Sequence, residues 1–416
     1  MTRNRYRRIV WFFGRTVLSI VVWELILPRL GLRAWSRRRR SQRLRQIARR
    51  YRALAIEMGG VLIKVGQFLS ARVDVLPFEM TAELADLQDE VPPEDFEDIR
   101  RVAEAELGAR LSDCFEQFDE TPLAAASLGQ AHRARLKSAP VSVVVKVQRP
   151  DIESIIAVDL AALRTVGKWL QRYRPIRRRA DVMALLDEFA RVLYEEIDYL
   201  AEGRNAEAFA AMFADDPRVQ VPGVVWTHTT KRVLTLDDVF AIKITDYEAI
   251  SAAGIERAEV AQRLFHTYLK QIFEEGLFHA DPHPGNLFIT PGPEPASWRL
   301  TFVDFGMVGR VPPNLRGGLR ELAIAVGTAD PARLVQAYLK LGVLLPHADR
   351  DSLERMEAQV FERFWGKSMA ELRAISWDEM RDFSREFRET VYAMPFQVPE
   401  DLILLGRTVA ILSGMC

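Results

Sequence analysis

The spacing of apolar residues divides the chain into helical and strand-like regions. Three regions have apolar residues at the three- and four-residue spacing of helices: residues 41–112, residues 180–213, which form one long predicted helix, and the chain after residue 258. Two regions have the pattern of short strands: residues 121–150 and residues 219–239. Pro92 and Pro93 separate two amphipathic helices, and a loop region over 279–310 interrupts the later helices. The pattern predicts an α+β protein with a helical extension, a small strand-rich lobe and a larger helical lobe.

Length and composition are those of an ordinary globular protein. The chain has 416 residues, enough for two or three lobes, with 49% hydrophobic and 27% charged residues. Its two cysteines, Cys114 and Cys416, provide neither a disulfide framework nor a zinc-binding spacing. We therefore expect a reducing, cytosolic environment.

Charge is distributed unevenly although the formal net charge is zero. Residues 1–52 contain 16 arginines and one acidic residue, Glu24, so acidic residues are in excess over the rest of the chain. A basic segment of this kind is typical of a protein that meets an anionic surface, either acidic lipid or nucleic acid. We expect no nucleic-acid partner, because no nucleic-acid-binding module accompanies the arginines.

The apolar part of this arm favours a membrane surface. "IVWFFGRTVLSIVVWELILPRLGL" (9–32) is rich in aromatic and aliphatic residues, but Arg15, Glu24 and Arg29 interrupt it. We expect an interfacial helix rather than a spanning one, peripheral to the cytoplasmic side of the membrane. The "RRRR" run at 37–40 would bind anionic headgroups. The alternative is a basic helix that packs on the protein's own acidic body.

One short loop concentrates polar residues that suit phosphoryl transfer. "HADPHPGN" (279–286) contains Asp281 and Asn286, and Asp304-Phe305-Gly306 follows an apolar strand. In kinases, the first aspartate orients the attacking hydroxyl, and the asparagine and the later aspartate bind magnesium. Hard oxygen ligands suit Mg²⁺. The same reaction needs a lysine on the phosphates and a glutamate that orients it, and Lys146 and Glu202 fit these roles.

With these residues in order, the chain resembles the UbiB/AarF family of atypical, protein-kinase-like proteins. The resemblance begins near residue 53 and rests on four motifs: H-A-D-P-H-P-G-N at 279–286; an alanine-rich nucleotide loop at Ala124, Ala125, Ala126 and Ser127; K-x-G-Q at Lys64, Gly66 and Gln67; and E-x-D at Glu196 and Asp198. Together and in this order they are highly specific. The resemblance implies a bilobal kinase-like fold with an N-terminal helical extension over the active-site cleft.

The resemblance also implies a function. It predicts a kinase or ATPase that uses ATP and Mg²⁺ at the membrane surface and supports isoprenoid-quinone (ubiquinone-type) biosynthesis or lipid handling. Its partners would be an anionic membrane surface, a lipid-like or isoprenoid-quinone precursor, and quinone-biosynthesis enzymes. Asp281, Lys146 and Glu202 would be catalytic, and Asn286 and Asp304 would bind the metal. Lys64 and Gln67, with the E-x-D acids, would gate the cleft.

Physical reasoning adds detail to these motifs. Alanines deny the nucleotide loop the positive-φ conformations that glycines allow, which stiffens it. Lys64 and Gln67 share one helix face, and Lys64 is expected near the phosphates or the E-x-D carboxylates. Gly59 and Gly66, seven residues apart, suggest a bare stripe for close backbone approach. On an ideal helix Asp198 shares a face with Glu202 while Glu196 points elsewhere, so the helix is distorted there or the two E-x-D acids meet different partners.

The predicted domains follow from the pattern and the resemblance. They are a basic membrane-associating arm (1–52), a helical extension with K-x-G-Q (53–120), a kinase-like small lobe (121–238) and a large lobe (239–416). The connection between the lobes, "LTLDDVFAIKITDY" (234–247), departs from the family's aromatic-rich stretch and makes adenine preference less certain. The chain stops in a helical pattern at "VAILSGMC", so we expect the large lobe to be C-terminally incomplete.

Three other functions compete with the kinase hypothesis. A metal-dependent hydrolase would use His279, Asp281 and His283 as ligands for Zn²⁺ or Mn²⁺, but it leaves Lys146 and Asp304 unexplained. A small-molecule phosphotransferase of the antibiotic-kinase type uses a similar loop, but needs no basic arm. A non-catalytic nucleotide-binding scaffold would not need the complete set of catalytic residues.

Overall fold

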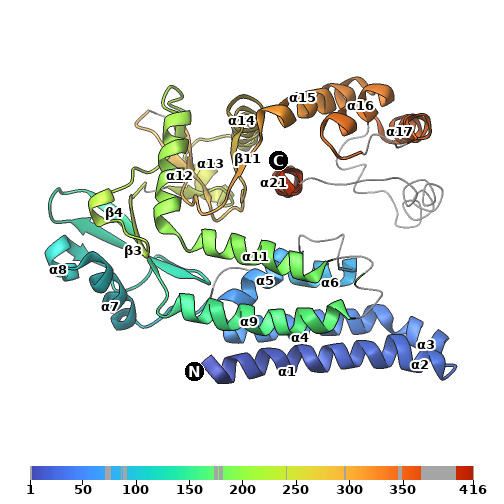
Figure 1. The fold of residues 1–416 in the computed structure, drawn as a ribbon. Helices are drawn as coiled ribbons and strands as arrows, with labels where there is room; N and C mark the ends of the chain where they lie inside the picture. Colours follow the sequence, from blue (N-terminus) through green and yellow to red (C-terminus); the bar gives the residue numbers. More distant parts are fainter. Residues whose placement is uncertain are drawn as a thin grey trace. The chain divides into compact units, whose positions relative to one another are not determined.

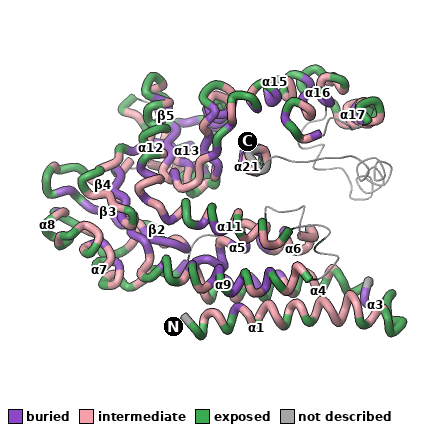
Figure 2. Tube along the Cα trace, viewed as in Figure 1, coloured by how far each residue is buried: buried purple, intermediate pink, exposed green. Residues whose placement is uncertain are grey.

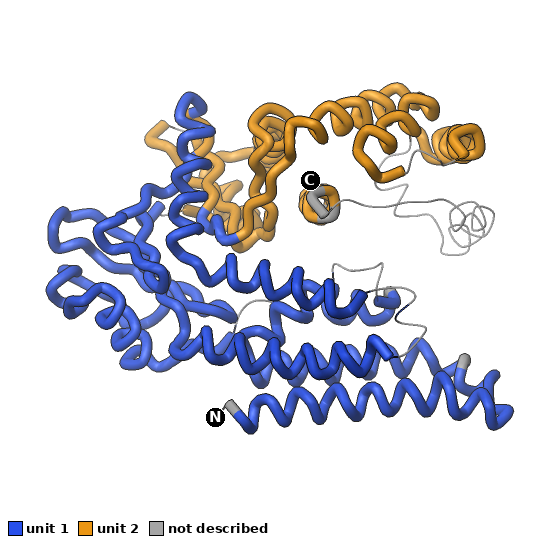
Figure 3. The backbone as a smooth tube through the Cα atoms, in the orientation of Figure 1, with its two compact units in different colours: residues 1–216, 220–240, 303–306 blue, residues 217–219, 241–302, 307–416 orange. Residues whose placement is uncertain are grey.

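The fold is taken from a computed structural model of residues 1–416, which describes residues 2–70, 76–85, 87, 91–172, 177, 181–239, 241–294, 297–344, 349–366 and 400–415. The chain divides into two compact units, coloured in Figure 3. Unit 1 contains residues 1–216, 220–240 and 303–306, and unit 2 contains residues 217–219, 241–302 and 307–416. Each unit is described by itself.

Unit 1 combines a helical layer with an antiparallel sheet (Figure 1). Its helices are α1 (Thr2–Val21), η1 (Val22–Ile26), α2 (Leu27–Arg29), α3 (Arg33–Arg38), α4 (Arg40–Met58), α5 (Val61–Ser70), α6 (Phe78–Ala85), α7 (Phe96–Leu107), α8 (Leu111–Cys114), α9 (Ile152–Gln171), α11 (Val182–Glu196), α12 (Tyr199–Met212) and η2 (Trp226–His228). Its strands are β1 (Phe115–Phe118), β2 (Ala124–Ala125), β3 (Gly129–Leu136), β4 (Ser142–Gln148) and β6 (Val233–Asp237). They pair in the order β1-β3-β4-β6, with β2 on β3.

Strand β4 shows why this sheet has two different faces. Successive side chains of a strand point to opposite sides, and Val143, Val145 and Val147 are fully buried in a core that includes Ile99 of α7. Lys146 lies between the buried valines on the opposite face, pairing in register with Leu234 of β6. The predicted strand with a lysine in it is therefore confirmed.

Unit 2 is mainly helical and contains two small sheets. Its elements are β7 (Ile242–Lys243), α13 (Tyr247–Ala252), α14 (Arg257–Leu269), η3 (Lys270–Glu275), β8 (Leu277–His279), β9 (Leu287–Pro291), β10 (Trp298–Phe302), β11 (Val308–Arg310), α15 (Pro313–Thr328), α16 (Pro331–Lys340), α17 (Arg350–Phe364) and α21 (Glu400–Met415). One sheet has the order β5-β10-β9-β7, where β5 is Val219–Gln220, and β11 pairs with β8 in the other. The expected loop region over 279–310 therefore contains β9, β10 and β11.

The single long helix predicted over 180–213 is wrong. The chain forms α11 and α12, which are separated at Ile197 and Asp198. The Asp198 side chain accepts a hydrogen bond from the Ala201 backbone N–H at 3.1 Å and so begins a new helix. Apolar periodicity continues through the break, which is why the pattern alone did not reveal it.

The predicted glycine stripe is also wrong. Gly59 ends α4 with a φ of 63°, in a conformation that favours glycine, and it lies on no helix face. Gly66 is within α5, where an added Cβ would lie 2.2 Å from Leu87 Cδ1 and 3.1 Å from Tyr51 Cε1. Gly66 therefore permits close packing of side chains, not of another backbone.

The N-terminal arm packs along the helical layer through a buried ion pair. Arg5 of α1 donates two hydrogen bonds to Asp159 of α9, at 2.7 and 2.6 Å, and the Asp159 side chain is fully buried. The same guanidinium donates to the carbonyls of Met58 and Gly59 at the end of α4. Ile9 is fully buried in this layer, and Figure 2 shows the remainder of α1 mostly half-buried or exposed. The alternative that the arm packs on the protein's own body is therefore correct for this face of α1.

The far end of the arm forms a hairpin tip that combines aromatic and basic residues. Trp23 and Trp35 stack with ring centroids 4.6 Å apart, and the Arg43 guanidinium lies 4.3 Å from the Trp23 ring. Leu30 and Leu32 at the turn remain 69% and 45% exposed. Among the described residues, Arg3–Arg29 is the one helical stretch long and apolar enough to cross a membrane. Length and composition thus allow a span as well as the predicted interfacial position.

A buried histidine in the small sheet predicts a pH-dependent stability. His132 of β3 donates from Nδ1 to the Asp119 carbonyl, so its Nε2 accepts from Gln130. The Gln130 carbonyl oxygen accepts from the Glu94 N–H, which fixes the orientation of the amide. Burial lowers the pKa of His132 below its ordinary value. Protonating His132 would place a second N–H against the Gln130 amide nitrogen.

We therefore expect acid to destabilise unit 1. Because the folded pKa is lowered, the contribution of His132 is complete above the ordinary histidine pKa and is lost as pH falls below it. His132→Gln should flatten the dependence on pH of the unfolding free energy between pH 6.5 and 5.5, by up to about 1.4 kcal/mol per pH unit. Urea denaturation at several pH values measures this, with His266→Gln, at an exposed position, as control. An unchanged slope in His132→Gln would contradict the assignment.

Candidate active site

Unit 1 brings together the predicted lysine, glutamate and D-F-G aspartate. Lys146 Nζ donates to Glu202 Oε1 at 2.5 Å and to Asp304 Oδ2 at 2.9 Å. Glu202 is 4% exposed, whereas the Asp304 side chain is 41% exposed. The cluster therefore has a buried carboxylate that holds the lysine and a second carboxylate that remains accessible.

The charge on Lys146 is secured by its two partners. Burial alone opposes the charged form, but the carboxylates of Asp304 and Glu202 outweigh it and raise the pKa of Lys146 well above its ordinary value. Lys146 is therefore a permanent cation at physiological pH. Such a cation can bind phosphate oxygens.

The D-F-G turn is fixed by helix α12. The Phe305 N–H donates to Glu202 Oε1 at 3.3 Å, and Asn205 Nδ2 donates to the Phe305 carbonyl at 3.0 Å. The fully buried Phe305 ring lies 5.3 Å from that of Phe209. Glu202, Asn205 and Phe209 recur at three- and four-residue spacing, so one face of α12 binds both the lysine and the turn.

The alanine-rich loop is held by backbone pairing. Ala124 and Ala125 form β2, paired with Ala131 and Gln130 of β3, and the Ala126 N–H donates to the Gly129 carbonyl at 2.8 Å. Ser127 is fully buried. These contacts fix the backbone at both ends of the loop, and the stiffness expected where alanines replace glycines stays a prediction.

Arg149 is a residue of this loop that sequence reasoning missed. Its Nε donates to the Ala126 carbonyl at 3.0 Å and its Nη2 to the Pro92 carbonyl at 2.8 Å, and it forms an ion pair with Glu94. Arg149 therefore ties the loop to the segment that precedes α7. It immediately follows β4 in "KVQRP", where an arginine at a strand end gives no signal of this role.

The K-x-G-Q helix places Lys64 against the first E-x-D acid. Lys64 and Glu196 form an ion pair with side chains 16% and 22% exposed. A methyl group added at Gly306 of the D-F-G turn would lie 3.9 Å from Glu196 Cγ and 3.9 Å from Glu202 Oε2. The Lys64–Glu196 pair is therefore next to the turn that carries Asp304. Lys64 meets the Glu196 carboxylate of the E-x-D motif, which is one of the two kinds of contact expected.

The remaining gating residues make local contacts. Gln67 Nε2 donates to the Leu87 carbonyl at 3.3 Å, and Asp198 caps α12 and pairs with Arg204 at 4.0 Å. The expectation that Asp198 shares a helix face with Glu202 fails because Asp198 is the cap and not an interior residue. The two E-x-D acids meet different partners, Lys64 for Glu196 and Arg204 for Asp198, which is one of the outcomes that the sequence allowed. A gating role for these residues stays a prediction.

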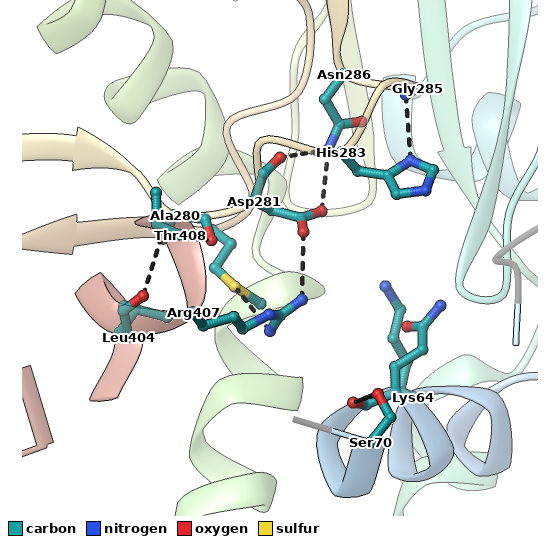
Figure 4. Close-up of polar contacts among 12 residues, drawn as sticks. Lys64, Ser70, Ala280, Asp281, His283, Gly285, Asn286, Leu404, Arg407 and Thr408 are labelled. Carbon is teal, nitrogen blue, oxygen red and sulfur yellow. Dashed lines mark hydrogen bonds and ion pairs between the residues drawn. The ribbon is translucent and has the colours of Figure 1, made fainter. Parts of the chain in front are cut away.

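Unit 2 holds the other two predicted site residues on the loop between β8 and β9 (Figure 4). Asn286 Nδ2 donates to the Asp281 carbonyl at 3.1 Å and to Asp281 Oδ2 at 3.0 Å. Arg407 of α21 donates to Asp281 Oδ1 at 3.3 Å. Asp281 lies two residues after the end of β8 and Asn286 directly precedes β9, so two paired elements fix both ends of the loop. Sequence reasoning missed Arg407.

The histidines of this loop do not form a metal site. His279 is 1% exposed, with its ring 5.4 Å from that of Phe302, whereas the His283 side chain is exposed and its Nδ1 accepts from the Gly285 N–H at 3.2 Å. Within the part of the chain that the structure describes, no three His, Cys, Asp or Glu side chains gather to hold a metal ion. Among these described residues, the ligand set of the metal-dependent hydrolase is not brought together.

The donor set of the kinase hypothesis suits Mg²⁺. This ion needs only one or two protein carboxylates and keeps several waters. Asp304 offers an accessible carboxylate. The amide nitrogen of Asn286 is used by Asp281, which leaves its carbonyl oxygen as the atom able to bind a cation. Both are hard oxygen donors, so the residues present fit the ion.

Comparison with protein-family profiles matches residues 86–338 to the ABC1 atypical kinase-like domain. The chain belongs to this family. The predicted UbiB/AarF membership and the kinase-like α+β fold are confirmed by this match and by the relatives that follow.

The relatives differ in how much of their own length aligns with this chain. ACTIVITY OF BC1 COMPLEX KINASE 8, chloroplastic, from Arabidopsis thaliana is 43% identical over 302 residues, which are 72% of this chain and 39% of the relative. The Synechocystis protein sll1770 is 36% identical over 423 residues, which are 99% of this chain and 70% of the relative. Rv3197 from Mycobacterium tuberculosis, solved as a complex with erythromycin, matches with a TM-score of 0.55 and 25% identity, covering 88% of this chain and 90% of that one. This ABC1-family chain thus spans well under half of the plant relative.

Proposed function

We propose that this ABC1-family chain binds ATP with Mg²⁺ and transfers the γ-phosphoryl group to an acceptor or to water. The observation that carries the proposal is the Lys146–Glu202–Asp304 cluster, in which one cation is held by a buried carboxylate beside an accessible one. Such an arrangement suits phosphate binding and metal binding together. Family membership supports it independently.

Each residue has a distinct role in this proposal. Lys146 binds phosphate oxygens and Glu202 orients it, while residues 124–127 cover the nucleotide. Asn286 and Asp304 hold Mg²⁺, which when bound neutralises charge on the phosphates. Asp281 positions the attacking hydroxyl or water. Gating of the site by Lys64, Gln67, Glu196 and Asp198 belongs to the same proposal.

The acceptor we propose is a lipid-like molecule, of the isoprenoid-quinone precursor type, or water. A helical extension that carries K-x-G-Q distinguishes this family from kinases that act on proteins, and the Lys64–Glu196 pair links that extension to the D-F-G turn. From the family resemblance we also propose that the protein supports quinone biosynthesis and that enzymes of that process are its partners.

Thermal unfolding with different ligands tests the proposed function. A ligand at 100 times its Kd stabilises the folded state by about 2.7 kcal/mol, so ATP with Mg²⁺ should raise the Tm by several degrees. ATP with EDTA should raise it much less. Stabilisation by Zn²⁺ without nucleotide would instead favour the hydrolase, and no shift with any combination would reject nucleotide binding.

A second candidate is a small-molecule phosphotransferase of the antibiotic-kinase type. It is favoured by the erythromycin complex of the relative Rv3197. Under this alternative, erythromycin would accelerate loss of the γ-phosphate from ATP and would itself become phosphorylated. Mass spectrometry of the macrolide after incubation distinguishes the two candidates.

The membrane contact we propose uses the hairpin tip, residues 23–39. Exposed leucines and stacked tryptophans there adjoin several arginines, which suits the interface of an anionic bilayer. The side of the membrane would be the cytoplasmic one. One face of α1 packs on α9, while Trp11 and Leu18 on α1 remain 65% and 62% exposed and would adjoin the tip at the bilayer.

We expect Leu30→Ser with Leu32→Ser to weaken binding to anionic vesicles. Burying an exposed leucine contributes about 1.5–3 kcal/mol, so the pair should lower the vesicle affinity at least tenfold. Co-flotation with vesicles containing phosphatidylserine measures it. Trp365→Ser, a 49% exposed residue of unit 2, is the control. Equal flotation of all three proteins would reject the tip as the membrane contact.

A further inference from the structure

Helix α21 holds the proposed nucleophile-positioning carboxylate from more than a hundred residues away in sequence. Arg407 Nη2 donates to Asp281 Oδ1 at 3.3 Å, while Asp281 Oδ2 accepts from Asn286 at 3.0 Å (Figure 4). The neighbouring Thr408 donates from Oγ1 to the Ala280 carbonyl at 3.2 Å. One turn of α21 therefore binds both the backbone and the carboxylate of the loop.

The position of α21 in unit 2 is fixed by packing as well as by polar contacts. Leu405 is 7% exposed and belongs to the same core as Phe278 and Ala280, which flank the start of the loop. Arg407 also contacts Met307 Sδ at 3.9 Å. The side chains of Arg407 and Asp281 are 30% and 32% exposed, so the pair is anchored yet accessible to a substrate.

The loop has no arginine or lysine of its own to orient the Asp281 carboxylate. Residues 279–286 contain neither lysine nor arginine. A carboxylate oxygen has two lone pairs, so with Asn286 on one oxygen and Arg407 on the other, Asp281 keeps acceptor sites whose directions are set by both partners. A guanidinium is suited to this because its planar fork fixes the direction of the hydrogen bond.

We propose that Arg407 is a positioning residue for the reaction: it orients the Asp281 carboxylate toward the attacking hydroxyl or water. This inference rests on the proposed function and extends it to α21. Arg407 acts through Asp281 and not on the nucleotide. Its loss therefore affects the rate of the chemical step and leaves ATP binding unchanged.

Steady-state kinetics of Mg²⁺-dependent ATP turnover test this role. A small misplacement of a reacting group costs up to about 100-fold, so Arg407→Met should lower kcat about 10- to 100-fold with KM for ATP within about twofold of wild type. Arg407→Lys keeps the charge and loses the fork, so its kcat should fall between those of wild type and Arg407→Met. The matched control is Arg333→Met, which removes an ion pair with Glu321 elsewhere in unit 2 and should leave kcat unchanged.

A double-mutant cycle separates positioning from a general structural effect. If Arg407 acts through Asp281, adding Arg407→Met to Asp281→Asn should cause no further loss of kcat. If Arg407→Met lowered kcat by the same factor in the wild-type and the Asp281→Asn backgrounds, the proposal would be overturned. An unchanged or raised kcat of Arg407→Met alone would also overturn it. If Arg407→Met does not fold, Arg407→Lys decides: wild-type kcat overturns the role, and a lowered kcat with unchanged KM supports it. Absence of turnover in the wild type would instead reject the proposed function, and the role with it.

Discussion

We expect Asp304→Asn to lower Mg²⁺-dependent ATP turnover at least about 100-fold while the fold survives. Losing one preorganised charged group in an active site costs on the order of 10²–10³ in kcat, and Asp304 is the accessible carboxylate of the Lys146 cluster. The fold should survive because Lys146 keeps Glu202 at 2.5 Å, so no buried charge is left unpaired. Asparagine also keeps the size of the side chain and an acceptor for the Gly306 N–H.

Turnover and the Tm shift by Mg²⁺-ATP are measured together for this variant. Asp113→Asn is the control, because it makes the same chemical change in an exposed ion pair with Arg110. It should behave as wild type in both assays. If Asp304→Asn kept the full Mg²⁺-dependent stabilisation by ATP, Asp304 would not be the metal ligand.

The second large effect is on stability: Arg5→Ala should destabilise unit 1 by about 3–5 kcal/mol. Removing one partner of a buried ion pair leaves an uncompensated charge, and Asp159 is fully buried. The matched control on the same helix is Arg8→Ala, whose partner Glu57 is 62% exposed. An exposed pair of this kind contributes about 1 kcal/mol or less. Urea denaturation of both variants compares the two pairs.

The pH dependence of Arg5→Ala follows from the state of Asp159. Burial raises the pKa of Asp159 and Arg5 opposes this, so removing Arg5 raises the pKa further. A carboxyl with a raised folded pKa stabilises the fold when protonated, at low pH, and this contribution is lost as pH rises through that pKa. The loss of unfolding free energy caused by Arg5→Ala should therefore become smaller as the pH is lowered. In the double variant Arg5→Met with Asp159→Asn, which has no buried charge at this position, the loss should nearly vanish. A deficit equal to that of Arg8→Ala would show that the pair is not buried in solution.

Much of unit 1 could be predicted because local patterns determine it. The run of valines around Lys146 identified strand β4, and Pro92 and Pro93 marked the break before helix α7. The break between α11 and α12 was missed because the apolar spacing continues through it, and the cap at Asp198 becomes visible only in three dimensions. The glycine stripe failed because Gly59 ends a helix.

In the site, the motif residues could be predicted from the sequence and the residues that support them could not. Lys146, Glu202 and Asp304 could be named because the chemistry of phosphate and magnesium requires those residue types in that order, and unit 1 brings them together. Arg149 and Arg407 could not be named. Each acts through long-range contacts, and one arginine among many carries no local signal of its partner.

The fate of the γ-phosphate tests the central claim most directly. The full chain is incubated with ATP labelled at the γ-phosphate, with Mg²⁺ or with EDTA, in the presence and absence of anionic vesicles. The account predicts that label leaves ATP only with Mg²⁺, as inorganic phosphate or as a labelled lipid, and that Asp281→Asn releases it much more slowly than wild type. Label that stays in ATP under every condition, or leaves equally with EDTA, would contradict the assignment of this site as a Mg²⁺-dependent phosphotransferase or ATPase.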